Sequence, residues 1–391
     1  AVSGVASCAK PARYRDAGGM SMRVLWLVLL ILFPVFAFAD ESASTSRLSD
    51  LLNEDNDEGL AKALTVRDFS FPEDHGPHPD FRNEWWYITG NLDGPDGRRF
   101  GFEITIFRFS LTSTPPERDS NWRTNQVYIA HLAVTDADRD RFYVAERFSR
   151  GALGLAGAQA KPFRVWIDDW EIASNTADSS WRVRAGDDEI ALDLALTPLR
   201  QPVLNGDRGL SRKASSIESA SYYYSITRLE TDGVLTINGD EYHVSGLSWL
   251  DREWSTSALA GDQIGWDWFA LQLSDGTDLM LYKIRKLDGT ADKNSSGTLS
   301  TGSGETVGLK LDDFEIVVNN TWESPEGGTY PSGWTLRLAE QDLELSVVPV
   351  ISDQELFTTV RYWEGAVDVT GTRGGERVGG RGYVELTGYA D

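Results

Sequence analysis

The sequence WWYITGNLDG at residues 85–94, followed by FGFEITIFRF at residues 100–109, predicts two β-strands joined by a tight turn. Aromatic and β-branched residues dominate both runs, as is typical of strands. Alternate positions place aromatic side chains on the same face, because successive side chains of a strand point to opposite sides. A second pair with a similar pattern occupies residues 266–285, with its turn at Asp275 and Gly276. This weak internal repeat predicts two similar β-rich halves.

Short runs of the same kind continue to the end of the chain, separated by Asp-Gly, Asn-Gly and Gly-Gly turns. Further strands are predicted at residues 126–135, 164–172, 189–197, 233–237, 241–246, 306–318, 333–338, 343–348, 361–370 and 381–387. No segment of comparable length has helical periodicity. The expected fold is therefore all-β, built from antiparallel barrels or sandwiches. Two segments are too long to be simple turns, and we expect 201–220 to form a lid and 287–305 to be disordered.

The first 65 residues differ in composition from the rest of the chain. Residues 1–19 precede a start methionine and are interpreted as the product of an overlong gene model. Residues 20–39 combine Arg23 with an apolar run and a small-residue cleavage site, the pattern of a signal peptide. The run is shorter than the ~20 residues of a membrane span and contains Pro34, so we expect no stable membrane insertion after cleavage. Residues 40–65 resemble an acidic linker, and the mature protein is predicted to be periplasmic or secreted.

The formal net charge of −23 limits the partners of the protein. A strongly acidic surface repels nucleic acids and anionic lipid headgroups, so we expect neither as a partner. The one cysteine, Cys8, lies upstream of the predicted signal peptide, which leaves no disulfide and no catalytic thiol in the mature chain.

No standard cofactor or catalytic motif is present, and no cofactor is predicted. The chain has no HExxH, no P-loop, no GxSxG and no GxGxxG after a strand. His75 and His78, flanked by Asp74, Asp80 and Glu84, have residue types that suit zinc. They also lie in a loop rich in proline, where such side chains commonly cap turns. We favour this structural interpretation and predict no metal site.

The stretch GLSWLDREW at residues 246–254 is the most informative for chemistry. In an extended strand, Trp249, Asp251 and Glu253 share one face, and Arg252 points the other way. In a functional interpretation, burial among aromatic rings raises the pKa of Asp251 or Glu253 so that the acid can donate a proton, and the rings stabilise a cation on the substrate. In a structural interpretation, Asp251 and Arg252 are partners at a domain junction. The residues alone leave both interpretations open.

Two further clusters combine aromatic and acidic side chains, one at residues 84–87 and one at residues 266–268. They could fill the core, since aromatic residues dominate core burial, or they could form a platform that stacks on sugars. Because they lie inside apolar strands, we expect them to contribute to a pocket for a small hydrophobic ligand. The predicted ligand-binding residues are Glu84, Trp85, Tyr87, Trp254, Trp266 and Trp268.

Several ordered motifs resemble the AttH-like family, which is similar to the carotenoid 1,2-hydratases (hydroxyneurosporene synthases) and is often described as predicted secreted hydrolases. The motifs are FPEDHGPHP at residues 71–79, EWWYITG at 84–90, SYYYS at 221–225, SWLDREW at 248–254, GWDWFA at 265–270, YWEG at 362–365 and GRGYVELTGY at 380–389. The resemblance covers residues 66–389. It implies two consecutive lipocalin-like antiparallel β-barrels, an N-terminal one at residues 66–248 and a C-terminal one at residues 249–391.

The resemblance also implies a site. In the hydratases, an aspartic acid protonates a terminal isoprenoid double bond and water captures the carbocation. Asp251 matches that aspartate, Trp249 stands where the hydratases have a tyrosine, and Tyr222 and Tyr224 match a histidine and a tryptophan of an upstream strand. The histidine is absent, so we expect Glu253 or a tyrosine to activate water. Asp251, Trp249, Tyr222, Tyr224 and Glu253 are therefore the predicted catalytic residues.

Three functions compete at this point. The first is an acid-catalysed hydratase or isomerase of an isoprenoid or other lipid-like alkene, which would make the protein a hydro-lyase. The second is a non-catalytic, lipocalin-type carrier of a lipid or small apolar molecule that works with an envelope ABC transporter, since an eight-stranded barrel can enclose one such ligand. The third is a carbohydrate-binding module built on surface tryptophans, which ranks last.

Overall fold

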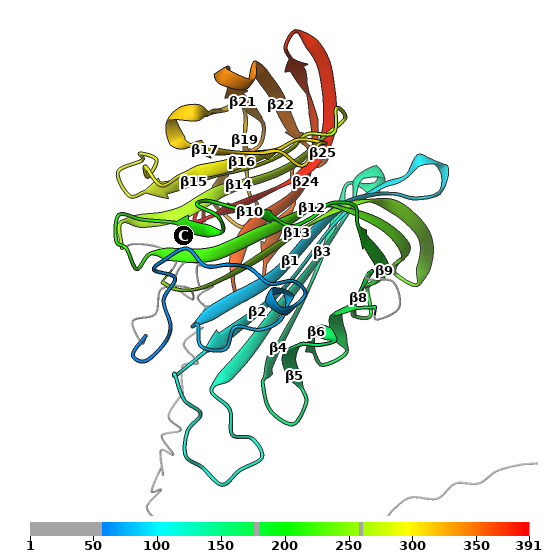
Figure 1. The fold of residues 1–391 in the computed structure, drawn as a ribbon. Helices are drawn as coiled ribbons and strands as arrows, with labels where there is room; N and C mark the ends of the chain where they lie inside the picture. The colour runs from blue at the N-terminus through cyan, green and yellow to red at the C-terminus, as the bar shows by residue number, and fades with distance from the viewer. Residues whose placement is uncertain (1–56, 176–179, 258–260, 391) are drawn as a thin grey trace, which may run out of the picture. The chain divides into compact units, whose positions relative to one another are not determined.

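The computed structural model describes residues 57–175, 180–257 and 261–390, whose regular structure is almost entirely antiparallel β-sheet (Figure 1). The helices of this part are short 3-10 turns: η1 (Glu73–His75), η2 (Pro95–Gly97), η3 (Ala137–Arg139), η4 (Leu311–Asp313) and η5 (Ala339–Gln341). None of the helices in these ranges is long and apolar enough to cross a membrane. The prediction of an all-β protein is confirmed. The predicted upstream segment, the signal peptide and most of the acidic linker lie outside the described residues.

The first sheet curls into a nearly closed barrel, in which β3 and β4 approach β5 and β6. Its strands, in order across the sheet, are β4 (Arg141–Arg150), β3 (Gln126–Asp136), β2 (Arg99–Ser110), β1 (Asn83–Asp93), β13 (Asp240–Ser257), β12 (Ala220–Ile237), β9 (Ile190–Pro198), β8 (Trp181–Gly186), β7 (Trp170–Ser174), β6 (Phe163–Ile167) and β5 (Ala156–Ala160), with β10 (Val203–Leu204) and β11 (Leu210–Arg212) also paired to β12. Apolar side chains such as Trp86, Ile104 and Trp170 fill its interior and are fully buried.

The second sheet forms a half-barrel. Its strands, in order, are β17 (Thr306–Lys310), β16 (Ser296–Ser300), β15 (Asp278–Lys286), β14 (Gln263–Leu273), β25 (Glu376–Thr387), β24 (Arg361–Arg373), β22 (Leu343–Pro349), β21 (Trp334–Leu338) and β18 (Glu315–Val318), with β23 (Glu355–Phe357) paired to β24. A separate ribbon joins β19 (Thr321–Glu323) to β20 (Thr329–Pro331). Phe269, Trp334 and Trp363 lie at the centre of its own core. The expected pair of barrels is thus one nearly closed barrel and one half-barrel.

Both predicted aromatic hairpins form, because β1 pairs with β2 and β14 pairs with β15. Residues 287–305 contain β16, so the prediction of disorder there is wrong. β16 pairs with β15 and places Gly297 against Leu281, where the absence of a side chain lets the strands approach. The predicted boundary between residues 248 and 249 falls inside β13. This strand stays in the first sheet to its end, because it pairs with both β1 and β12, and the second sheet begins at β14.

The last residues of the predicted linker pack on the first sheet. Ala63 is fully buried, and the Tyr222 hydroxyl donates a hydrogen bond to the carbonyl oxygen of Thr65 at 2.8 Å. Residues 57–65 therefore belong to the fold.

The two sheets meet where β1 contacts β25, β12 contacts β14, β2 and β3 contact β24, and β4 contacts β23. Asn91 Nδ2 donates to the carbonyl oxygen of Gly382 at 2.9 Å. Gln272 Nε2 donates to the carbonyl oxygens of Thr227 and Ser248, at 2.7 and 3.0 Å. One face of β13 thus lines the barrel and the other lies between the sheets.

A methyl group at Gly246 tests this packing, because its Cβ would lie 2.1 Å from the backbone oxygen of Asn91 on β1. We expect Gly246→Ala to lower the free energy of unfolding by about 1–3 kcal/mol, since two paired strands would have to separate. Gly308→Ala is the control, because a Cβ on β17 meets no atom within 4 Å, and we expect a change within about 0.5 kcal/mol. Urea denaturation measures both, and equal midpoints for the two variants would contradict this prediction.

Candidate active site

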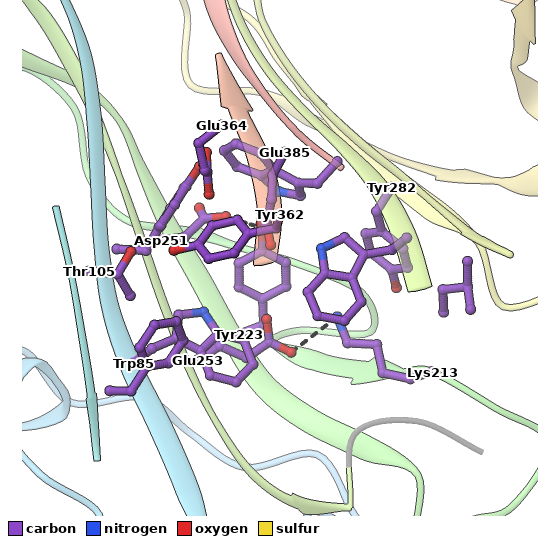
Figure 2. Close-up of a pocket in the computed structure, with 15 residues that line it drawn as sticks. Trp85, Thr105, Lys213, Tyr223, Asp251, Glu253, Tyr282, Tyr362, Glu364 and Glu385 are labelled. Atoms are coloured by element: carbon purple, nitrogen blue, oxygen red, sulfur yellow. Dashed lines mark hydrogen bonds and ion pairs between the residues drawn. The ribbon is translucent and has the colours of Figure 1, made fainter. Parts of the chain in front are cut away.

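A pocket lies between the two sheets and encloses about 760 Å³ of empty space, its open mouth included. The residues that line it are Trp85, Tyr87, Thr105, Phe107, Lys213, Tyr223, Asp251, Glu253, Trp266, Trp268, Tyr282, Ile284, Tyr362, Glu364 and Glu385 (Figure 2). Aromatic rings make up most of the wall, and four carboxyl groups and one amine are set among them. The pocket is therefore apolar in its body and acidic at specific points.

Six of the sequence-predicted residues line this pocket, and they come from three strands. They are Trp85, Tyr87, Asp251, Glu253, Trp266 and Trp268. Trp249 lies beside them, and its indole Nε1 donates a hydrogen bond to Asp251 Oδ1 at 2.7 Å. The predicted alternation along β13 is confirmed, because Trp249, Asp251 and Glu253 share one face.

The other predicted residues point into the first barrel. In the register of β12 with β13, Tyr222 pairs with Trp254, Tyr223 with Glu253, and Tyr224 with Arg252. Cross-strand partners share a face, so Tyr222, Tyr224 and Trp254 lie on the barrel side and Tyr223 lies in the pocket. Tyr222 and Tyr224, the two positions matched from the resemblance, therefore do not face the pocket. Only the register of β12 with β13 shows which of the three consecutive tyrosines faces the pocket.

Asp251 lines the pocket on the side of the first sheet, where it lies on β13, and it is only 3% exposed. Its Oδ1 accepts hydrogen bonds from Ser225 Oγ at 2.5 Å and from Trp249, and its Oδ2 accepts one from the Tyr223 hydroxyl. Burial raises the pKa of Asp251 to about 7, even though these three donors favour the carboxylate. Both protonation states are therefore accessible near neutral pH. Trp268 Nε1 donates to the Tyr223 oxygen at 3.1 Å, which fixes that ring.

Glu253 is held in an ion pair with Lys213. The Lys213 ammonium lies 3.0 Å from Glu253 Oε1, the contact drawn as a dashed line in Figure 2, and 4.3 Å from the centre of the Tyr282 ring. Burial disfavours the charge on Lys213, but Glu253 and Tyr282 raise its pKa above the ordinary value, so it stays protonated. Ser221 Oγ donates a hydrogen bond to Glu253. Lys213 follows β11 in the segment predicted as a lid, and that segment supplies a wall of the pocket.

Glu364 and Glu385 are the acids of the opposite wall, on β24 and β25. Tyr87 donates a hydrogen bond to Glu364 Oε2 at 2.8 Å, whereas Glu364 Oε1 is buried and has no hydrogen-bond partner within the described ranges. Burial raises the pKa of Glu385 to about 8, and burial together with Glu385 and Glu103 raises the pKa of Glu364 well above its usual range. Both are neutral acids at pH 7. The sequence prediction missed them because they come together with Asp251 only through the contact between the sheets.

Glu84, predicted to bind ligand, is instead enclosed on the barrel side. Arg108 Nε and an Arg252 guanidinium nitrogen donate to its two oxygens, and the backbone N–H of His78 donates to both, at 3.0 and 3.1 Å. Burial by itself would raise the pKa of Glu84, but Arg108 and Arg252 hold it well below its usual range. A permanently charged group between two buried arginines is a structural element of the first sheet.

The two histidines considered for zinc make other contacts. His75 Nδ1 lies 2.7 Å from the Tyr224 hydroxyl, and the His78 ring stacks on Trp254 with ring centres 3.7 Å apart. His78 Nε2 lies 3.0 Å from Asp74 Oδ1. Within residues 57–175, 180–257 and 261–390, no group of three His, Cys, Asp or Glu is arranged to hold a metal ion.

Comparisons with known proteins agree with this architecture. A family model described as AttH-like matches residues 62–389. The fold is similar to the crystal structure of a protein from Nitrosomonas europaea described as an AttH, with 35% sequence identity and a TM-score of 0.77 over 85% of this chain and 100% of that one. It is also similar to kievitone hydratase from Nectria haematococca, with 17% identity and a TM-score of 0.63 over 86% and 97% of the chains. CghA is similar at 12% identity and a TM-score of 0.51, over 86% and 97%. The last two similarities concern the fold alone, and no curated protein matches the sequence.

The different charge states of Glu84 and Glu364 can be tested by stability. We expect Glu84→Gln to lower the free energy of unfolding at pH 7 by about 3–5 kcal/mol, because two buried guanidinium groups lose their counter-charge. Glu364→Gln replaces an acid that is already neutral, so we expect a change below about 1 kcal/mol. Urea denaturation of both variants at pH 7 checks the difference. Similar losses in the two variants would show that the charges are assigned incorrectly.

Proposed function

We propose that this chain, which belongs to the AttH-like family, adds water to a carbon–carbon double bond of an apolar small molecule such as an isoprenoid, with Asp251 as the proton donor. The observation that carries the proposal is a buried aspartic acid with a pKa of about 7 in the wall of an aromatic pocket. A general acid works best when its pKa is near the working pH, because it then holds a proton and gives it up readily.

The first step is protonation of the alkene. The Asp251 proton forms a C–H bond at one carbon, the π bond breaks, and the neighbouring carbon becomes a carbocation. Ser225, Trp249 and Tyr223 then stabilise the carboxylate that remains, because all three donate hydrogen bonds to it. These bonds exist before the reaction, so the site needs little rearrangement to accept the charge.

The carbocation forms in surroundings that suit a cation. The faces of aromatic rings attract positive charge, and this attraction strengthens where water is excluded. Trp85, Trp266 and Trp268 supply indole rings, the rings that bind cations best. The reaction ends when the oxygen of a water molecule bonds to the cationic carbon and loses a proton, which gives an alcohol. If the cation loses a proton from a neighbouring carbon instead, the product is an isomeric alkene.

The comparisons support this class of reaction without naming the substrate. One structural neighbour carries the name of a hydratase, and its fold extends over most of this chain. The largely aromatic wall favours a substrate with an apolar body, since apolar surface leaves water at low cost in such a pocket.

Substitution of the acid tests the proposal. With farnesol as the first probe of a panel of acyclic isoprenoid alkenes, we expect wild-type protein in H₂¹⁸O to form an alcohol heavier by 20 mass units, the mass of H₂¹⁸O. We expect Asp251→Asn to reduce the rate by about 10²–10⁴-fold, because the amide cannot donate the proton. Asp169→Asn, in an exposed turn, is the control. Mass spectrometry that recovers only unaltered alkene bound to the wild-type protein would favour the carrier, and an active Asp251→Asn variant would eliminate this mechanism.

The proposal also predicts a direction of pH dependence. Only protonated Asp251 can start the reaction, and its proton is lost as the pH rises through a pKa of about 7. We therefore expect kcat/KM to fall about tenfold for each pH unit well above that value. Rates measured between pH 7 and pH 9.5 check this, and a rate that increases over this range would contradict the assignment of Asp251 as the acid.

A further inference from the structure

A tyrosine in the pocket wall is joined to the outside of the protein through a histidine and a glutamate. The Tyr362 hydroxyl lies 2.6 Å from Nδ1 of His131, and Nε2 of His131 lies 3.1 Å from Oε1 of Glu146. Tyr362 and His131 are buried, whereas the Glu146 side chain is 27% exposed. The three residues come from β24, β3 and β4, so this series of hydrogen bonds runs from the second sheet to the first.

The hydrogen bonds determine which proton each group holds. Partial burial alone would raise the pKa of Glu146, but its hydrogen bond with His131 keeps it below the usual range, so Glu146 is ionised. A carboxylate can only accept a hydrogen bond, so His131 Nε2 must be the donor. In the neutral form of an imidazole that donates from Nε2, the other ring nitrogen has a free lone pair and can accept the hydrogen bond of Tyr362. A hydroxyl, an imidazole and a carboxylate in this order form the arrangement that activates a hydroxyl group for proton transfer.

Glu146 is itself held in place from the second sheet. The Thr359 hydroxyl donates to its Oε2 at 2.9 Å, and the Thr359 backbone N–H donates to its Oε1 at 3.2 Å. His131 and Glu146 are direct cross-strand partners in the register of β3 with β4. Because Glu146 is held in place, its hydrogen bond with Nε2 fixes one edge of the His131 imidazole, and the Tyr362 hydroxyl contacts the other nitrogen.

The proposed hydration needs a group that takes a proton from the attacking water. Glu253 already accepts contacts from Lys213 and Ser221, and Glu364 and Glu385 hold their own protons. We infer that Tyr362 takes this proton and passes its own to His131, with His131 and Glu146 as positioning residues. The inference rests on the proposed function and deepens it, because it assigns the second proton transfer of the same reaction.

The step balances as follows. As the water oxygen bonds to the cationic carbon, one water proton moves to the Tyr362 oxygen and the Tyr362 proton moves to Nδ1 of His131. The imidazolium that results is stabilised by the Glu146 carboxylate. After the alcohol leaves, the Nδ1 proton returns to Tyr362 while Tyr362 releases the proton it took from water, and that proton reaches the Asp251 carboxylate through water in the pocket. Each group thereby regains the proton with which it started. Burial raises the pKa of Tyr362 well above its usual range, so Tyr362 relays a proton without persisting as a phenolate.

Deuterium separates the two proton transfers in one experiment. In D₂O with farnesol, protonation by Asp251 followed by loss of a proton from carbon places deuterium in the recovered alkene, whereas capture by water gives the alcohol. We expect His131→Asn, Tyr362→Phe and Glu146→Gln to reduce alcohol formation by about 10²–10³-fold while deuterium still enters the alkene. Asp251→Asn should lose both products. Glu146→Gln is the sharpest variant, because its amide can donate to Nε2 and so place the imidazole proton on the wrong nitrogen.

A matched control is available in the first barrel. His75 makes the same kind of hydrogen bond, to the Tyr224 hydroxyl at 2.7 Å, but faces away from the pocket. We expect His75→Asn to keep both products. We also expect Glu146→Asp to recover part of the alcohol lost in Glu146→Gln, and Tyr362→Phe combined with His131→Asn to be no slower than either alone.

The outcomes distinguish a failure of the proton relay from a failure of the proposed hydratase function. Relay variants that form alcohol at the wild-type rate would overturn the inference and leave the proposed function intact. Relay variants that lose deuterium incorporation together with alcohol would also overturn it, because the defect would then affect the whole pocket. A fully active Asp251→Asn variant, or a wild-type protein that converts no alkene of the panel, would overturn both. Independently of activity, ¹⁵N NMR should show the His131 proton on Nε2, and a proton on Nδ1 would contradict the relay.

Discussion

Residues 248–256 of strand β13 are buried on both faces, and the rest of the molecule is arranged around this constraint. The odd-numbered side chains from Trp249 to Glu253 face the second sheet, and Leu250, Arg252 and Trp254 face the interior of the first barrel. A strand in this position exposes almost nothing to water, so each polar side chain on it must find a partner inside the protein. The half-barrel covers what would otherwise be an exposed wall, and the pocket is the part of that contact left unfilled.

The buried carboxyl groups on the two sides of β13 are stabilised by different kinds of partner. On the barrel side, Arg252 and Arg108 enclose Glu84, and the charges compensate one another. On the pocket side, Asp251 has hydroxyl and indole donors and, among the residues that the structure describes, no ion-pair partner, so it can both hold a proton and release it near neutral pH. The first arrangement gives stability, since removal of one charge leaves others uncompensated. The second leaves a group whose protonation can change during a reaction.

The proposed chemistry divides between the sheets in a similar manner. Asp251 belongs to the first sheet, and Tyr362 belongs to the second, so an alkene between them would meet an acid on one side and a route for proton removal on the other. Neither sheet alone contains both groups. A protein that catalyses such a reaction therefore requires the contact between its sheets as much as it requires either barrel, and the hydrogen bonds of Asn91 and Gln272 across that contact help to hold the geometry.

The sequence by itself determined the β architecture and one face of the site. Alternating aromatic strands with glycine-rich turns are local patterns, and the two-residue period of a strand places Trp249, Asp251 and Glu253 on one side without any knowledge of the fold. Which side that is, and what lies opposite, depends on pairing and packing. The tertiary structure decided that Tyr223, and neither Tyr222 nor Tyr224, faces Asp251, because strand register is set between segments distant in sequence. It also placed Glu364, Glu385 and the Tyr362–His131–Glu146 chain at the pocket, although these groups lie more than a hundred residues from Asp251. His131 and Glu146 are positioned by the pairing of strands within the first sheet, whereas Tyr362, Glu364 and Glu385 approach Asp251 only when the second sheet covers β13.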